Sequence, residues 1–163
     1  MPELTIRSGF FVGLGLAFVS GAFLICLWQP DRQVNRHAAS LLRQIETRNW
    51  TGVESLIGDE YSDQWGNDRP TVLARLREVF RSAPNIRILA IGPTVKIDHD
   101  KATWRARIKF EGDGEEVVMV LKDHVNSLSA PFKLDWRRVS AKPWDWKLVR
   151  VTNKELQIPE GLD

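Results

Sequence analysis

The longest apolar stretch of the chain lies close to its amino terminus. Residues 9–28 contain no charged side chain, and the uncharged run extends from residue 8 to residue 30. Twenty helical residues rise about 30 Å, which is the thickness of the hydrocarbon core of a bilayer. A lone segment in lipid must satisfy its own backbone hydrogen bonds, so it has to be helical. The pattern therefore predicts a transmembrane helix over residues 9–28, after a short tail over residues 1–8.

A cleaved secretory leader is the alternative for this segment, because Ser20, Gly21 and Ala22 are small enough for a signal peptidase. The charges of Glu3 and Arg7 cancel, however, and the apolar run is longer than the roughly 7–15 residues of a leader core. We therefore favour a retained single-pass anchor. The excess of arginines after the segment favours a cytoplasmic soluble domain. Those arginines also fit the polar face of a folded helix, and a short amino-terminal tail more often stays inside, so we predict an extracytoplasmic soluble domain.

Small residues recur at every fourth position of the predicted anchor, at Gly9, Gly13, Ala17 and Gly21. This spacing lets two helix backbones approach closely, as in paired membrane helices. Glycine and alanine are also common in membrane helices that do not pair. The segment thus predicts contact with the lipid bilayer along residues 9–28, and it leaves a homodimer through this face as one alternative.

Residues 29–163 are numerous enough for one soluble domain with its own core. Apolar positions at helical spacing predict three helices in its first half. The first covers residues 31–47, and the second starts with the capping-box pattern of Thr51 and Glu54 and ends near residue 58. The third begins at Asn67 or Asp68, accommodates Pro70 in its first turn and ends near residue 82.

From residue 86 onward the apolar positions change to a period of 2, which is typical of strands. The clearest alternation covers residues 102–110, with Trp104 on one face and Arg105 on the other. Further strands are predicted over residues 86–97, with an interruption at Gly92 and Pro93, and over residues 115–121, 132–136 and 144–151. Helices followed by a meander of antiparallel strands indicate the α+β class.

The helical run over residues 41–80 resembles the corresponding half of the nuclear transport factor 2-like superfamily. The turn at residues 98–102 and the closing segment WDWKLVRV, which starts at Trp144, resemble the sheet of the same superfamily. The resemblance covers almost all of the soluble part. It implies three helices packed on a curved antiparallel sheet, with a cone-shaped pocket between them. Members include isomerases, cyclases, dehydratases and binding domains, so the resemblance does not fix a function.

Aromatic side chains are candidates for lining that pocket, because the chain contains 7 tryptophans. Trp104, Trp136 and Trp146 fall on the apolar side of predicted strands, where large residues beside small ones could leave room for an apolar ligand. Tyr61 and Trp65, from an irregular polar stretch, complete the predicted ligand-binding set, with Trp65 expected at the mouth of the pocket. The alternative is that the tryptophans simply fill the core.

Acid–base residues suited to an isomerase in such a pocket are Tyr61, Asp63, His124 and Asp135. Their spacing identifies no constellation, so we predict no catalytic residue. The histidines are scattered and the chain has a single cysteine, so we also predict no metal site and no cofactor. An isomerase, cyclase or hydrolase with a carboxylate in the cone is kept as the alternative to a non-enzymatic domain.

Charge adds little to this picture, since the formal net charge is only +2 and predicts no nucleic-acid partner. One strand does carry a basic stripe of Arg105, Arg107 and Lys109. The stripe is either a contact for anionic lipid headgroups or a solvated strand face. Together, the patterns predict a membrane-anchored binding or assembly domain that engages a protein or a small apolar ligand.

Overall fold

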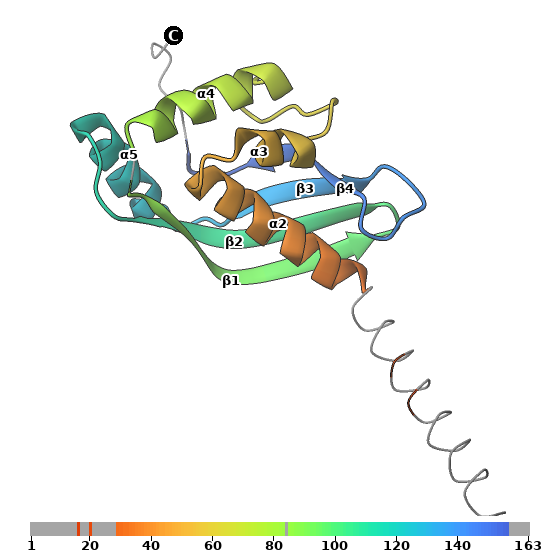
Figure 1. The fold of residues 1–163 in the computed structure, drawn as a ribbon. Coiled ribbons are helices and arrows are strands. Elements are labelled where there is room, and N and C mark those ends of the chain that lie inside the picture. Colours follow the sequence, from red (N-terminus) through yellow and green to blue (C-terminus); the bar gives the residue numbers. More distant parts are fainter. Residues whose placement is uncertain (1–15, 17–19, 21–28, 84, 157–163) are drawn as a thin grey trace, which may run out of the picture.

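The chain after residue 28 folds into four helices and one antiparallel sheet in the computed structural model, which describes residues 16, 20, 29–83 and 85–156 (Figure 1). The helices are α2 (Pro30–Glu46), α3 (Trp50–Leu56), α4 (Arg69–Arg81) and α5 (Glu116–Ser127). The strands are β1 (Arg87–Asp98), β2 (Lys101–Glu111), β3 (Phe132–Arg138) and β4 (Trp146–Thr152). They form one sheet in the order β1-β2-β3-β4, with each neighbouring pair antiparallel. The predicted α+β class is confirmed.

The predicted transmembrane helix lies outside the described residues, apart from Leu16 and Ser20, which are both helical. The four small residues of its proposed dimer face and the tail over residues 1–8 are also outside them. Within the described part of the chain, no helix is long and apolar enough to cross a membrane.

The helix starts follow local capping chemistry. The Asp68 side chain accepts a hydrogen bond of 2.9 Å from the Thr71 amide, and Pro70 lies in the first turn of α4, as predicted. The predicted capping box at Thr51 is wrong, because the cap lies two residues earlier, at Asn49, whose side chain accepts a hydrogen bond from the Gly52 amide at 3.1 Å. Helix α2 begins at Pro30, one residue before the predicted start, and it has no side-chain cap.

Helix α5 replaces the strand predicted over residues 115–121. Its buried residues Val118, Val125 and Leu128, the last at its C-cap, fall at helical spacing. The Asn126 side chain donates to the Phe110 carbonyl at 2.9 Å and accepts from the Phe110 amide at 2.8 Å. It thereby satisfies the backbone of β2 beyond the point where β3 pairs with it. The apolar, β-branched composition of this segment suggested a strand, but packing against β2 decided the outcome.

Irregular pairing bends the sheet at two places. The pairing of β1 with β2 shifts register between Ile91 and Thr94, where Gly92 has a positive φ of 63°. The predicted interruption at Gly92 is therefore a bulge inside one continuous strand. A second shift occurs between β3 and β4 at Asp135 and Trp136. Bulges of this kind bend strands and increase their twist.

The sheet has two faces of opposite character. Helices α2, α3 and α4 all lie over one face, which we call the inner face (Figure 1). This face carries Trp104, Trp136, Trp146 and Leu148, which pack with the buried stripe of α2. None of the helices α2 to α5 covers the opposite side of the sheet, which we call the outer face (Figure 1). The alternating burial of β2 shows the same division along a single strand.

Candidate functional site

The three tryptophans of the predicted ligand set lie together on the inner face, and each is only 1% exposed. The Trp104 indole nitrogen donates to Asn35 Oδ1 at 2.9 Å, and the Trp146 indole nitrogen donates to the Pro143 carbonyl at 2.9 Å. The ring of Trp136 meets the edge of His37, with 6.1 Å between ring centroids. The tryptophans therefore pack into the space between helices and sheet.

The other two members of the set lie in the connection between α3 and α4. Tyr61 is buried in the same hydrophobic core, at 4% exposed. Trp65 is half-buried, and its indole nitrogen donates to the Leu156 carbonyl at 3.1 Å. Trp65 thus packs against the segment that follows β4.

Tyr61 and Asp63 form a buried pair, in which Tyr61 is a hydrogen-bond donor and Asp63 is a carboxylate. The Tyr61 hydroxyl lies 3.5 Å from Asp63 Oδ2, which also accepts from the Asn67 side-chain amide at 2.9 Å. Asp63 Oδ1 accepts from the backbone amides of Trp65 and Asn67 at 2.9 Å and 2.8 Å. Burial, together with the negative charge of Asp63, raises the pKa of Tyr61 well above its usual value. Both carboxylate oxygens are thus occupied in holding the loop, and the phenol stays protonated.

The remaining acid–base candidates lie elsewhere. His124 is exposed on α5, while Asp135 lies on the outer face. Asp135 accepts hydrogen bonds from the Thr103 hydroxyl at 2.7 Å and from Lys133 Nζ at 2.9 Å. The four candidates therefore do not converge on one site. Among the residues that the structure describes, no group of three His, Cys, Asp or Glu side chains is placed to hold a metal ion.

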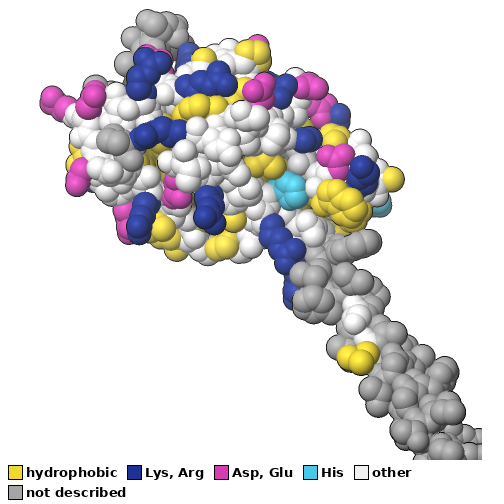
Figure 2. Space-filling view, viewed as in Figure 1, with side chains coloured by type: hydrophobic (Ala, Val, Ile, Leu, Met, Phe, Trp, Pro, Cys, Tyr) yellow, Lys and Arg dark blue, Asp and Glu magenta, His cyan; other side chains and the backbone are white. Residues whose placement is uncertain are grey.

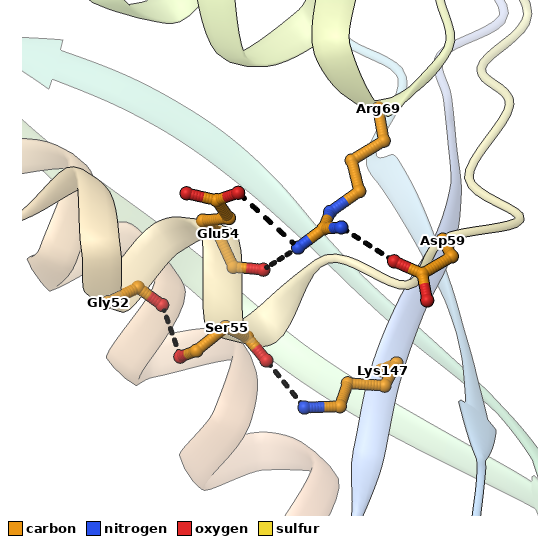
Figure 3. A network of polar contacts seen from close by, with 6 residues as sticks. All are labelled: Gly52, Glu54, Ser55, Asp59, Arg69 and Lys147. Carbon is orange, nitrogen blue, oxygen red and sulfur yellow. Dashed lines mark hydrogen bonds and ion pairs between the residues drawn. The ribbon is translucent and has the colours of Figure 1, made fainter.

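A hollow of about 460 Å³ lies between α3, the start of α4 and the β3–β4 end of the sheet. Figure 3 shows the contacts of Arg69 and Lys147 in this hollow, and two further lining residues, Arg137 and Glu60, form an ion pair with each other. Arg69 donates to Asp59 Oδ1 at 2.6 Å and to the Glu54 carbonyl at 3.0 Å. Lys147 Nζ donates to the Ser55 carbonyl at 2.6 Å. The residues come from four separate elements, so no sequence pattern could have brought them together, and their charges balance one another.

The outer face carries a strong excess of cations. Direct cross-strand pairs on this face include Lys109 with Leu89, Arg107 with Ile91 and Arg105 with Lys133. The basic residues that the register places on this face are Arg87, Lys96, Lys101, Arg105, Arg107, Lys109, Lys133, Arg137, Lys147 and Arg150, and its carboxylates are Asp98, Glu111 and Asp135. Two of these cations already have partners, since Arg137 forms an ion pair with Glu60 and Lys147 donates to the Ser55 carbonyl. The predicted stripe of three basic residues is therefore part of a wider basic surface.

Two large apolar side chains lie within this basic surface. Leu89 is 38% exposed and Ile91 is 44% exposed, both on the edge strand β1. One further carboxylate lies near its margin, since Arg107 contributes to lowering the pKa of Glu155, after the hydrogen bonds from the amides of Ala130 and Ser129. The outer face thus combines exposed apolar groups with unbalanced positive charge.

No family model matches the chain, and no curated protein matches it. Solved structures do resemble it. Bd1075 from Bdellovibrio bacteriovorus covers 75% of this chain with a TM-score of 0.58 and 8% identity, and this chain spans 39% of that protein. An NTF2-like protein with a cystatin-like fold from Novosphingobium aromaticivorans covers 82% of this chain and 85% of its own length, with a TM-score of 0.55 and 16% identity.

A candidate ketosteroid isomerase from Shewanella frigidimarina covers 76% of this chain and 95% of its own length, with a TM-score of 0.57 and 11% identity. These similarities confirm the predicted fold, which is the nuclear transport factor 2-like, cystatin-like α+β fold. At such low identities the similarity concerns the fold alone, and it carries no activity across to this chain.

Proposed function

We propose that the chain is a membrane-anchored binding domain whose outer sheet face engages an acidic protein partner. One observation carries this proposal: tryptophans that are 1% exposed occupy the inner face, whereas the outer face is open and basic. In this fold the inner face would supply a small-molecule pocket. With that face packed, the exposed surface is the better candidate for recognition.

The chemistry of the outer face fits a protein more closely than a small molecule. Arginine together with apolar anchors is typical of protein interfaces, and complementary charge guides encounter and register. Leu89 and Ile91 would supply the apolar anchors, while Arg105, Arg107 and Lys109 would pair with carboxylates of the partner. Such a face recognises an acidic segment or surface patch.

The anchor is proposed from sequence. Residues 9–28 carry no charge, and helix α2 starts at Pro30, almost directly after them. We propose on this basis a single-pass protein whose binding domain lies close to the bilayer, on its extracytoplasmic side. A pair of such chains, joined through the small residues of the anchor, would present two outer faces side by side.

A small-molecule isomerase, cyclase or hydrolase is the second candidate. Its support is the fold, which the candidate isomerase from Shewanella frigidimarina and a candidate dehydratase from Streptomyces avermitilis share, and the buried pair of Tyr61 and Asp63. An enzyme would need a carboxylate that is free to exchange a proton with a substrate. Because four hydrogen-bond donors already occupy Asp63, the binding domain has the stronger case.

Site-specific photocrosslinking of the full-length chain in its native membranes tests the proposal. A benzophenone amino acid is placed at Ile91 on the outer face or at Ala39, which is exposed on α2. We expect an adduct with an acidic protein from position 91 only. The double substitution Arg105→Glu and Arg107→Glu should abolish it.

Arg77→Glu with Arg81→Glu, on the exposed side of α4, makes the same change in charge and serves as the matched control. Circular dichroism verifies that both double variants are folded. Equal adducts from positions 91 and 39, or an adduct that survives reversal of the outer-face charges, would contradict the proposal.

A further inference from the structure

One end of the domain brings together the start of α2, the β1–β2 turn and the β3–β4 loop (Figure 1). Contacts of α2 fix this arrangement. Asn35 accepts a hydrogen bond of 2.9 Å from Trp104 near the start of β2, and His37 contacts Trp136 near the end of β3. The first turns of α2 therefore lie over the end of the sheet at which the 139–145 loop projects.

That loop exposes two large apolar side chains. Val139 is 49% exposed and Trp144 is 48% exposed, in a loop of only seven residues. Backbone hydrogen bonds hold its shape, from the Val139 amide to the Asp145 carbonyl at 2.9 Å and from the Asp145 amide to the Lys142 carbonyl at 3.2 Å. Figure 2 shows hydrophobic side chains at this end of the domain, close to the start of α2. The exposure of Val139 and Trp144 is thus built into the fold.

The path of the chain brings this end close to the predicted anchor. Only Gln29 lies between residue 28 and Pro30, and its carbonyl already accepts a hydrogen bond of 3.1 Å from the Gln33 amide. An extended residue spans at most about 3.6 Å. A domain joined so tightly to a membrane segment must keep the start of α2 at the level of the lipid headgroups.

We infer that this end of the domain rests in the headgroup layer of the bilayer, with Trp144 inserted into it. The inference rests on the proposed membrane anchor and adds a second, separate contact with lipid. An indole suits the interface because it has an apolar ring and one polar N–H, which is why tryptophan is enriched at that depth. Val139 adds apolar area beside it.

The charged side chains at this end of the domain favour neither anionic nor zwitterionic lipid. Basic and acidic residues are nearly balanced there, with Arg32, Arg36, Lys101, Arg138 and Lys142 against Asp31, Asp98, Asp100 and Asp145. The contact should therefore form on zwitterionic phosphatidylcholine and gain little from anionic lipid. This separates it from binding by the outer face, where basic residues dominate.

Depth-dependent fluorescence quenching tests the inference on the full-length chain in phosphatidylcholine vesicles. Cys26 is the only cysteine, so Cys26→Ser clears the background for a single labelled cysteine. The reporter is a nitrobenzoxadiazole dye on Ala141→Cys in the loop, and the matched control carries the dye on Asp113→Cys in the exposed turn after β2, at the opposite end of the sheet. Spin-labelled lipid should quench position 141 several-fold more than position 113. Adding Trp144→Ser should reduce the quenching at position 141 by about half.

The outcomes separate this inference from the proposed anchor. Release of the chain from vesicles by alkaline carbonate would overturn the anchor itself. If the chain stays on the vesicles but positions 141 and 113 are quenched equally, the anchor is retained and the contact of this end with the headgroup layer is wrong. Strong quenching that ignores Trp144→Ser would overturn the role given to the indole. Quenching that appears only at high protein-to-lipid ratio would mean that a second copy of the chain covers the loop.

Discussion

The two faces of the sheet are made by the same strands, yet they differ in almost every physical respect. In β2, Trp104 points to the inner face and is 1% exposed, while its neighbour Arg105 points outward and is exposed. Side chains alternate along a strand, so one segment can serve the core and the surface at once. The inner residues stabilise the fold by packing in the core. The outer residues do not pack in the core, so they can serve to recognise a partner.

The difference has an energetic side. A buried tryptophan removes a large apolar area from water and contributes several kcal/mol, whereas most exposed residues change stability by less than about 0.5 kcal/mol when substituted. We therefore expect the outer face, where basic residues outnumber carboxylates, to contribute little to stability.

The largest expected effect of a single substitution comes from Trp104→Ala on the inner face. It removes a fully buried indole and leaves Asn35 without its hydrogen-bond donor. We expect the free energy of unfolding to fall by about 3–5 kcal/mol. Urea unfolding of the full-length chain in detergent, followed by far-ultraviolet circular dichroism, measures the change.

Trp144→Ala is the matched control, because it removes the same side chain from an exposed loop. It should cost about 1 kcal/mol or less. Comparable losses from the two substitutions would remove the energetic distinction between a packed inner face and an exposed loop.

An intermediate effect is expected from pH, through Tyr61 at the margin of the inner core. Burial raises the pKa of Tyr61 above the value of about 10 that it has in the unfolded chain. The folded protein therefore keeps this proton longer than the unfolded chain does. The resulting stability is fully present below about pH 10 and is lost above it, by at most about 1.4 kcal/mol per pH unit.

Because Tyr61 is the only tyrosine, phenolate absorbance reports this group alone. We expect phenolate to form together with unfolding, and Tyr61→Phe to flatten the alkaline limb of the stability curve. Phenolate that appears near pH 10 while the circular dichroism stays native would show that the hydroxyl is accessible to water. Such a result would reopen the case for a substrate-binding pocket around Tyr61.

The contrast between faces also explains how far sequence reasoning reaches. The alternation over residues 102–110 predicted β2 and its two faces correctly. In a half-buried strand, every second side chain packs in the core and is apolar, and the side chains between them face water and are polar. The segment over residues 115–121 was wrongly predicted as a strand. The helical spacing of Val118, Val125 and Leu128 extends beyond that segment, and the short apolar run alone does not separate a strand from a helix that packs on one side.

The candidate site was harder to predict, for a physical reason. The pattern placed Trp104, Trp136 and Trp146 on one face, and all three do lie there. Whether large residues fill a space or line it depends on the packing of α2 over them, which spacing along the chain does not encode. Similarly, the basic surface required the register of β1 and β3 with β2 before Lys96 and Lys133 could be added to the predicted stripe.

The smallest expected effect on stability comes from Arg105→Ala at the centre of the outer face. Arg105 lies directly opposite Lys133 on β3, and like charges in that position repel one another. The ion pair of Lys133 with Asp135, at 2.9 Å, removes part of this repulsion. The substitution should therefore change the free energy of unfolding by less than about 0.5 kcal/mol, with a slight gain at low salt that disappears as salt screens the charges.

Parallel urea titrations at low and high salt measure this change, with Arg77→Ala on α4 as the control for an exposed arginine. A decrease of more than about 1 kcal/mol in the free energy of unfolding would show that Arg105 stabilises the fold. That result would contradict the proposal that the outer face serves to bind a partner. A neutral or stabilising result, combined with loss of the photoadduct from position 91 when Arg105 and Arg107 are reversed, would mean that the cation is kept for binding. Only that combination separates a recognition surface from an ordinary solvated strand.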